Sequence, residues 1–170
     1  MNRHPANSRG LKMGSIGCGA WVRPFLEESV AVQVRFQEVD TLRIVWHGHY
    51  VAYLEDGRRA FGRRYGVDYP LFRERGVAIP VVHLAMDYLA PALMDDVLTV
   101  TARLLKTDCA RLDFDYEVRR ATDGVLLARA ETRQAFTTPQ GELLLGWPDF
   151  MEERLKSWEA QWRPPLSERP

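Results

Sequence analysis

The sequence predicts an α+β domain in which one long helix lies on an antiparallel sheet of about five strands. Three observations predict this fold class. A segment of alternating apolar and polar residues precedes a single long helical pattern, and four more alternating segments follow it. These later segments are joined mainly by short turns, which is typical of antiparallel neighbours. The chain has 170 residues, which is enough for one ordinary domain but too few for two comfortable ones.

The first strand and the helix come in that order. Alternation starts at Val30 and reaches Phe36, so a strand is expected there, and residues 1–28 before it are expected to form a flexible arm. Apolar residues then recur at the spacing of one helix face, which predicts a helix from about Trp46 to Arg64. Its repeating positions are Tyr50, Leu54, Gly57, Phe61 and Tyr65. Gly66 is a plausible C-cap, and Pro70 prevents continuation.

Four further strands are expected near residues 82–88, 98–104, 112–118 and 125–138. In the third of these, Asp113, Asp115 and Glu117 alternate with apolar residues, so we expect one face to be exposed to water. An Asp123-Gly124 turn leads into the last strand. A short helix from about residue 149 to 158 follows. The domain is expected to span residues 29–160, with 161–170 as a flexible tail.

Composition excludes several classes of protein. Lys plus Arg and Asp plus Glu both count 23, so no net positive field favours nucleic acid. No apolar run is long enough for a membrane span, and the N-terminal residues lack the apolar core of a signal peptide. Cys18 and Cys109 stand far apart without metal-ligand spacing. We therefore expect a cytoplasmic protein with no nucleic-acid or membrane partner, no metal and no cofactor.

The stretch between the first strand and the helix has the most unusual composition, with histidines and aromatic residues close to a carboxylate. Asp40 stands after the strand and before the helix. A helix N-terminus offers unpaired N–H groups, which stabilise a developing oxyanion while a nearby carboxylate activates water or attacks. A turn or capping role for Asp40 is the other interpretation. His47 and His49 are two residues apart and do not face each other on a helix, so a shared metal is not expected.

The same stretch resembles the 4-hydroxybenzoyl-CoA thioesterase family, including its Tol-Pal-associated acyl-CoA thioesterases. The matching residues are Asp40, Ile44-Val45-Trp46-His47, Tyr50, Tyr53, Glu55 and Arg58, followed later by Ile79-Pro80-Val81-Val82 and Asp95-Asp96-Val97-Leu98. The likeness spans roughly residues 30–158. It implies a hotdog fold, a long helix wrapped by a curved antiparallel sheet, with active sites between the subunits of a homodimer or homotetramer.

The resemblance also implies an activity. By position, Asp40 matches the catalytic carboxylate, acting as general base or nucleophile, and the backbone N–H of His47 matches the donor that polarises the thioester carbonyl. The expected reaction is hydrolysis of a small or medium acyl-CoA to the free acid and coenzyme A. A thioester suits such a site because its carbonyl gains charge on attack and its thiolate leaves without a strong acid.

Substrate-binding roles follow from the resemblance, each beside a plainer interpretation. Trp46 and Tyr50 would line the acyl pocket, although aromatic residues at helical spacing also form cores. Arg43 stands where many family members carry Gly, so it either selects a polar acyl group or is a solvated loop residue. Arg58, Lys106 and Arg111 would meet the phosphates of coenzyme A, whereas cations late in a helix also complement its dipole.

Other functions remain open at this point. A thioesterase acting on an acyl carrier protein shares the same chemistry but needs a protein docking surface. A non-catalytic subunit that only binds acyl thioesters is a second alternative. Hotdog-fold dehydratases would need a His paired with a carboxylate at other positions, and the place of Asp40 argues against them.

Overall fold

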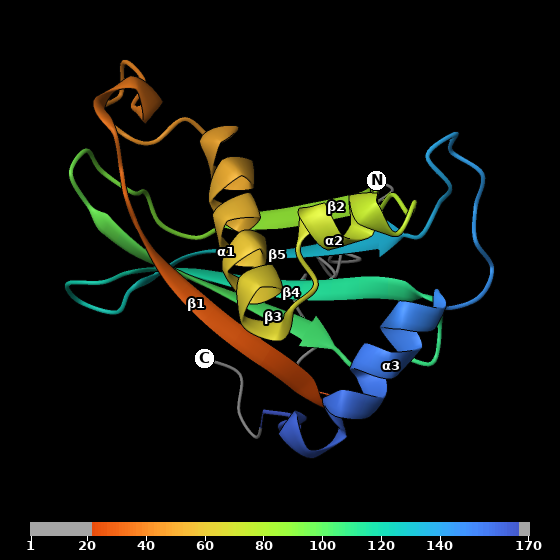
Figure 1. The fold of residues 1–170 in the computed structure, drawn as a ribbon. Helices are drawn as coiled ribbons and strands as arrows, with labels where there is room; N and C mark the ends of the chain where they lie inside the picture. Colours follow the sequence, from red (N-terminus) through yellow and green to blue (C-terminus); the bar gives the residue numbers. More distant parts are fainter. Residues whose placement is uncertain (1–21, 167–170) are drawn as a thin grey trace, which may run out of the picture.

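The computed structural model describes residues 22–166 and shows an antiparallel sheet curved around one long helix (Figure 1). The elements, in chain order, are β1 (Phe25–Gln33), the 3-10 helix η1 (Phe36–Glu38), α1 (His49–Tyr65), α2 (Tyr69–Glu74), β2 (Val81–Tyr88), β3 (Val97–Leu105), β4 (Arg111–Arg120), β5 (Leu126–Ala135), α3 (Asp149–Ser157) and the 3-10 helix η2 (Glu159–Gln161). The 5-stranded sheet has the order β1-β3-β4-β5-β2, and all neighbouring strands are antiparallel. The predicted α+β architecture is confirmed.

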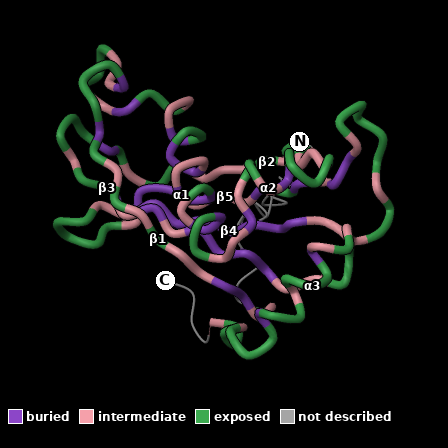
Figure 2. Tube along the Cα trace, in the orientation of Figure 1, coloured by how far each residue is buried: buried purple, intermediate pink, exposed green. Residues whose placement is uncertain are grey.

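Helix α1 packs closely on the sheet, and the core lies between them (Figure 2). A Cβ atom added at Gly57 would lie 2.9 Å from Cγ1 of the fully buried Val100 on β3, so glycine is needed for this close approach. The helix begins at His49, later than the predicted Trp46, because Trp46 O accepts a hydrogen bond from His49 N in a turn that precedes it. It ends as predicted, with Gly66 at φ 67° as the C-cap.

Strand β1 starts earlier than the alternation indicated. The prediction of a flexible arm up to residue 28 is wrong for the last part of that segment, since β1 begins at Phe25. Phe25 also exchanges backbone hydrogen bonds of 3.0 and 2.9 Å with Arg163, which ties the first residues of the predicted tail to the sheet. The strand ends at Gln33 because β3, its pairing partner, begins opposite it at Val97. Cys18 lies outside the described residues.

The acidic face of β4 is buried, which overturns the expectation that it is exposed to water. Asp113, Asp115 and Glu117 have exposed fractions of 3%, 5% and 8%. Strand β4 is the centre of the sheet, so long side chains of its neighbours cover this face. Arg23 lies 2.9 Å from Asp113, and Arg103 lies 3.4 Å from Glu117, so the carboxylates are paired with cations as they are buried.

The other predicted elements are present, and one helix was not predicted. Gly124 adopts φ 72° in the predicted turn, and α3 lies where the short final helix was expected. The additional helix α2 follows Asp68, whose side chain accepts a hydrogen bond from Leu71 N, and Pro70 stands in its first turn. Pro70 therefore starts a new helix as well as ending the old pattern. None of the helices in the described range is long and apolar enough to cross a membrane.

Candidate active site

The segment between β1 and α1 forms a small hairpin with Asp40 near its tip. Trp46 N donates to Glu38 O at 2.9 Å, and Asp40 N donates to Ile44 O at 2.9 Å. Residues 38–40 therefore run antiparallel to residues 44–46, with three residues at the turn. In Figure 1 this segment (orange) projects beyond the sheet, next to the N-terminal end of α1. The backbone thus fixes Asp40 at the rim of the domain, close to a helix start.

Asp40 combines a fixed carboxylate with a free oxygen. The residue is half-buried, and its Oδ1 accepts a hydrogen bond of 2.7 Å from Leu42 N. Within residues 22–166 the second oxygen, Oδ2, accepts no hydrogen bond. The turn role considered from the sequence is therefore present. It leaves one oxygen available for chemistry, because the turn uses only Oδ1.

Arg43 closes the hairpin turn in a strained conformation. Its N–H donates to Asp40 O at 3.0 Å, and its φ of 62° lies in the left-handed region that favours glycine. Glycine adopts this conformation without strain, so arginine is the less favourable residue at this position. The turn keeps the backbone shape that glycine would give it, at the cost of local backbone strain. The Arg43 side chain is exposed to solvent.

His47 lies in the turn immediately before α1. The His47 carbonyl accepts hydrogen bonds from the Tyr88 hydroxyl at 3.0 Å and from Tyr50 N at 3.4 Å. Its own N–H makes no backbone hydrogen bond to another described residue, and it lies at the positive end of the helix dipole. His47 stands three residues beyond Ile44, the hairpin partner of Asp40, on the side of the hairpin that leads into α1.

Trp46 covers the start of the helix. Its ring is half-exposed and lies 4.7 Å from the His47 ring and 5.6 Å from the His49 ring, measured between centroids. A Cβ atom added at Gly48 would overlap the Trp46 ring, so glycine is needed there for the ring to fold over the turn. The structure therefore places Asp40, Trp46 and His47 at the end of the molecule that the hairpin forms.

Tyr50, by contrast, is part of the core. It is 3% exposed, and its hydroxyl accepts a hydrogen bond of 3.1 Å from Ala92 N. Burial, the largest cause, raises the pKa of Tyr50, although the backbone hydrogen bond from Ala92 opposes this. Tyr50 thus ties the connection between β2 and β3 to α1, below the hairpin.

A buried carboxylate, Glu38, holds the hairpin to α1, and the sequence did not single it out. Glu38 Oε2 accepts hydrogen bonds from the Tyr53 hydroxyl at 2.7 Å and from Arg35 N at 2.8 Å. Burial and then the neighbouring Glu38 carboxylate raise the pKa of Tyr53 well above its usual range, so Tyr53 is a permanent donor. The alternation that ends at Phe36 does not mark Glu38, because Phe36 itself is 80% exposed in the 3-10 helix η1.

The residues predicted to meet coenzyme A phosphates are engaged elsewhere. Arg58 is buried, forms an ion pair with Glu55 and packs over the Tyr69 ring at 5.2 Å. With its amide in the better-bonded orientation, Gln134 also accepts a hydrogen bond from the Arg58 guanidinium. The Arg58 guanidinium is therefore held by partners within the protein and is not turned outward toward a phosphate.

Lys106 and Arg111 also have protein partners. Lys106 Nζ lies 2.8 Å from Glu159, and Arg111 Nε lies 2.9 Å from Asp113. Both side chains lie far from the hairpin along the sheet, since the turn between β3 and β4 joins them. No group of three or more His, Cys, Asp or Glu side chains in the described part of the chain is arranged to hold a metal ion.

Comparison with known proteins places the fold and the hairpin in a family. The model of the thioesterase-like superfamily matches residues 34–155, which contain the hairpin, α1 and all strands after β1. A 1,4-dihydroxy-2-naphthoyl-CoA hydrolase of Rippkaea orientalis is 25% identical over 128 residues, covering 74% of this chain and 93% of the relative. An acyl-CoA thioesterase of Haemophilus influenzae, YbgC, is 28% identical over 63% of this chain and 78% of its own length.

A plant relative differs in the carrier of its substrate. The chloroplastic acyl-acyl carrier protein thioesterase ATL3 of Arabidopsis thaliana is 31% identical over 51% of this chain and 46% of its own length.

Solved structures show the same fold. Protein TT1821 of Thermus thermophilus superposes with a TM-score of 0.68 and 35% identity, covering 76% of this chain and 97% of that one. A 4-hydroxybenzoyl-CoA thioesterase mutant complexed with 4-hydroxybenzoyl-CoA superposes with a TM-score of 0.65 and 23% identity, covering 74% and 96%. The second likeness establishes the fold alone.

Together, the helix wrapped by a curved sheet and the match to the thioesterase-like superfamily define a class, the hotdog-fold thioester hydrolases. The chain belongs to the thioesterase-like superfamily, and the family expected from the sequence is confirmed.

Proposed function

We propose that the protein hydrolyses a small or medium acyl-CoA to the free acid and coenzyme A, with Asp40 as the catalytic carboxylate. The observation that carries this proposal is the geometry of Asp40, whose Oδ1 is fixed by Leu42 N while Oδ2 accepts no hydrogen bond from residues 22–166. Such a carboxylate is oriented without spending both oxygens on the turn. The named activities of the two bacterial relatives support the substrate class.

The proposed reaction uses few protein groups. Asp40 either takes a proton from water as the water attacks the thioester carbon, or attacks that carbon itself and is then released by water. The N–H of His47 stabilises the negative charge that develops on the carbonyl oxygen. The C–S bond breaks, and coenzyme A leaves as a thiolate, which needs no strong acid. Trp46 and Arg43, both exposed on the segment that carries Asp40, would contact the acyl group.

The test is steady-state thiol release from aliphatic and aromatic acyl-CoAs by the wild type and by Asp40→Asn. Asparagine keeps an acceptor oxygen for Leu42 N, so the substitution removes the charge and retains the turn. We expect a loss in kcat of at least about a hundredfold in a folded variant. Wild-type activity that Asp40→Asn retains would show that another group does the chemistry.

A second candidate substrate is an acyl group held on a carrier protein, which the plant relative favours. The two substrates are separated by running the same acyl group on coenzyme A and on a carrier protein at two salt concentrations. Selective and salt-sensitive hydrolysis of the carrier-bound thioester would favour this alternative. Binding of both thioesters without turnover of either would favour a non-catalytic subunit.

We propose a homodimer as the minimum assembly, with dimers able to pair into a homotetramer. Strand β2 is an edge of the sheet, and its exposed apolar side chains include Val82, Leu84 and Tyr88. An unpaired edge with apolar residues is a template for another strand. Sedimentation of the wild type and of Leu84→Lys tests this: the wild type should sediment as a dimer or tetramer, and the variant should dissociate. A monomeric wild type would contradict the proposal.

A further inference from the structure

The second half of α1 carries four arginines, and two of them, Arg59 and Arg63, are available to bind a ligand. Arg58 is buried and paired with Glu55, whereas Arg64 forms a loose pair of 3.8 Å with Glu28 and lines neither of the two hollows described below. Arg59 and Arg63 lie between them, both exposed. Arg59 forms an ion pair with Asp56 at the limiting distance of 4.0 Å, and both side chains are largely exposed to solvent. Such a pair is weak.

Arg59 and Arg63 stand one helical turn apart and project from the same side of α1. Two like charges at this spacing repel each other by a few tenths of a kcal/mol in a bare helix. An anion between them would remove the repulsion and accept hydrogen bonds from both guanidinium groups. The planar arrangement of their donors suits phosphate oxygens in particular.

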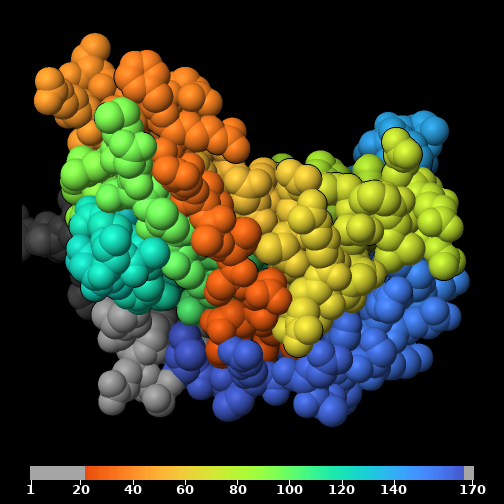
Figure 3. Space-filling model, turned by 60° about the vertical axis from the view of Figure 1, so that its left-hand side comes forward, coloured from red at the N-terminus to blue at the C-terminus, as the bar shows by residue number. Residues whose placement is uncertain are grey.

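The two arginines form a ridge between two hollows. One hollow, of about 220 Å³, lies between α1, α2 and the sheet. The other, of about 560 Å³, lies between α1 and β1. Arg59 and Arg63 line both, and no other described residue does. In Figure 3 this half of α1 (yellow) lies at the surface between β1 (red-orange) and α2 (yellow-green), so the ridge is open to a ligand from outside.

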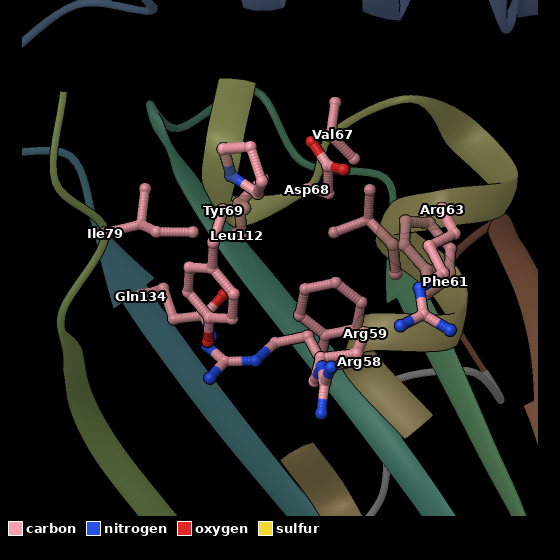
Figure 4. Close-up of a pocket in the computed structure, with 13 residues that line it drawn as sticks. Arg58, Arg59, Phe61, Arg63, Val67, Asp68, Tyr69, Ile79, Leu112 and Gln134 are labelled. Atoms are coloured by element: carbon pink, nitrogen blue, oxygen red, sulfur yellow. The ribbon is translucent and has the colours of Figure 1, made fainter. Parts of the chain in front are cut away.

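The hollow beside α2 is built for an apolar group under an anion. Its apolar lining comes from α1 and from strands β3 and β4, through Phe61, Leu104, Leu112 and Phe114. Figure 4 shows the Arg58 guanidinium turned toward Gln134 in the wall, whereas the Arg63 guanidinium lies on the other side of the view. The only carboxylate in this lining, Asp68, already caps α2 through Leu71 N. Apolar walls with cations at the rim fit an amphipathic anion.

The position of the ridge along α1 matches the length of one such ligand. Arg59 is ten residues after His49, where the helix begins, so it lies about 15 Å farther along the helix axis, at a rise of 1.5 Å per residue. The pantetheine arm of coenzyme A joins its sulfur to its pyrophosphate through about a dozen bonds of ~1.5 Å, an extended reach of roughly 15 Å. A thioester held at the helix start thus brings the phosphates to the ridge.

We propose that Arg59 and Arg63 bind the phosphate groups of coenzyme A, with the hollow beside α2 taking the apolar part of the arm or the adenine ring. This assignment rests on the proposed function for its substrate. It replaces Arg58, Lys106 and Arg111, whose guanidinium or ammonium groups have protein partners. The ridge recognises the carrier portion of the substrate and takes no part in bond breaking.

The experiment compares one acyl group on two thiols, coenzyme A and pantetheine, which lacks the phosphates. It uses the full-length wild type, the double variant Arg59→Gln/Arg63→Gln and the control Arg64→Gln, an exposed neighbour that lines neither hollow. For acyl-CoA the double variant should raise KM at least about tenfold, the order of effect of a lost charged hydrogen bond, with kcat nearly unchanged. KM for acyl-pantetheine should not change, and the control should behave as the wild type.

An unchanged KM for acyl-CoA, or an equal rise for both thioesters, overturns the proposal. Calorimetric titration of coenzyme A and of adenosine 3′,5′-bisphosphate separates this outcome from failure of the proposed function. If no thioester is hydrolysed but coenzyme A binds the wild type and not the double variant, the ridge stands while the activity falls. If acyl-CoA is hydrolysed but both compounds bind the double variant as tightly as the wild type, the activity stands while the ridge falls.

Discussion

The two halves of α1 differ in what they present, although one helix forms both. The first half is buried through Tyr50 and Tyr53, whose hydroxyl groups hold the adjoining loops by hydrogen bonds. The second half carries arginines beside two hollows. The first half holds the hairpin and the β2–β3 connection through these hydrogen bonds, whereas the second offers long, adaptable side chains. We conclude that substitutions in the first half should change kcat, and those in the second should change KM.

After Asp40 itself, the largest effect is expected at Glu38. In Glu38→Gln, a neutral carbonyl oxygen replaces the charged Oε2 that accepts from both Tyr53 and Arg35 N, so both hydrogen bonds lose the contribution of the charge. We expect a loss of about 2 kcal/mol in the free energy of unfolding. Because the hairpin loosens, we also expect kcat to fall about tenfold or more at constant KM. Denaturant unfolding and steady-state kinetics measure the two effects.

Tyr65→Phe is the matched control for that test. Tyr65 stands at the other end of α1, and its hydroxyl donates to Glu27 O at 3.1 Å. Its loss should cost about 1 kcal/mol and leave kcat unchanged. A drop in kcat as large as that of Glu38→Gln would show that general loosening of α1, and not the hairpin, controls the chemistry.

Gly57, at the boundary between the halves, gives a smaller effect on stability. In Gly57→Ala the new methyl group meets the stiff, fully buried Val100 side chain, and the strain outweighs the gain in helix propensity. We expect a net loss of about 1 kcal/mol. Adding Val100→Ala should give a double variant more stable than the sum of the single losses predicts. Strict additivity of the two changes in thermal unfolding would refute the contact.

Arg43 gives the smallest effect. In Arg43→Gly the strain at φ 62° is relieved, but the unfolded chain gains freedom, so stability should change by less than about 1 kcal/mol. Arg43→Val places a β-branched residue at this φ and should lose more. If Arg43→Gly keeps stability but changes the preference among acyl-CoAs, the side chain contacts the acyl group. An unchanged preference leaves Arg43 a residue of the turn alone.

Much of this arrangement could be predicted from the sequence, because it depends on local pattern. Alternation located β2 to β5, and the aromatic residues at helical spacing located α1. Asp40 was singled out by the family resemblance, since its place between a strand and a helix left a turn role equally open. The start of α1 could not be placed as well, since Trp46 and His47 belong to a turn whose hydrogen bonds depend on Gly48 and the Trp46 ring.

The rest depends on residues distant in the sequence. The alternation of Asp113, Asp115 and Glu117 indicated an exposed face, and only the central place of β4 buries it. Glu38 likewise gains its role from Tyr53, fifteen residues later. Arg58 could not be distinguished from Arg59 by sequence, because its burial follows from Glu55 and Tyr69 packing around it.

The buried carboxylates of β4 constrain how this sheet can change during evolution. Replacing Asp113 alone would leave Arg23 and Arg111 without their shared partner, and replacing one arginine would leave part of a buried charge uncompensated. Coordinated replacement by apolar residues of similar volume would meet no such penalty. Substitutions on this face should therefore occur in correlated sets across neighbouring strands.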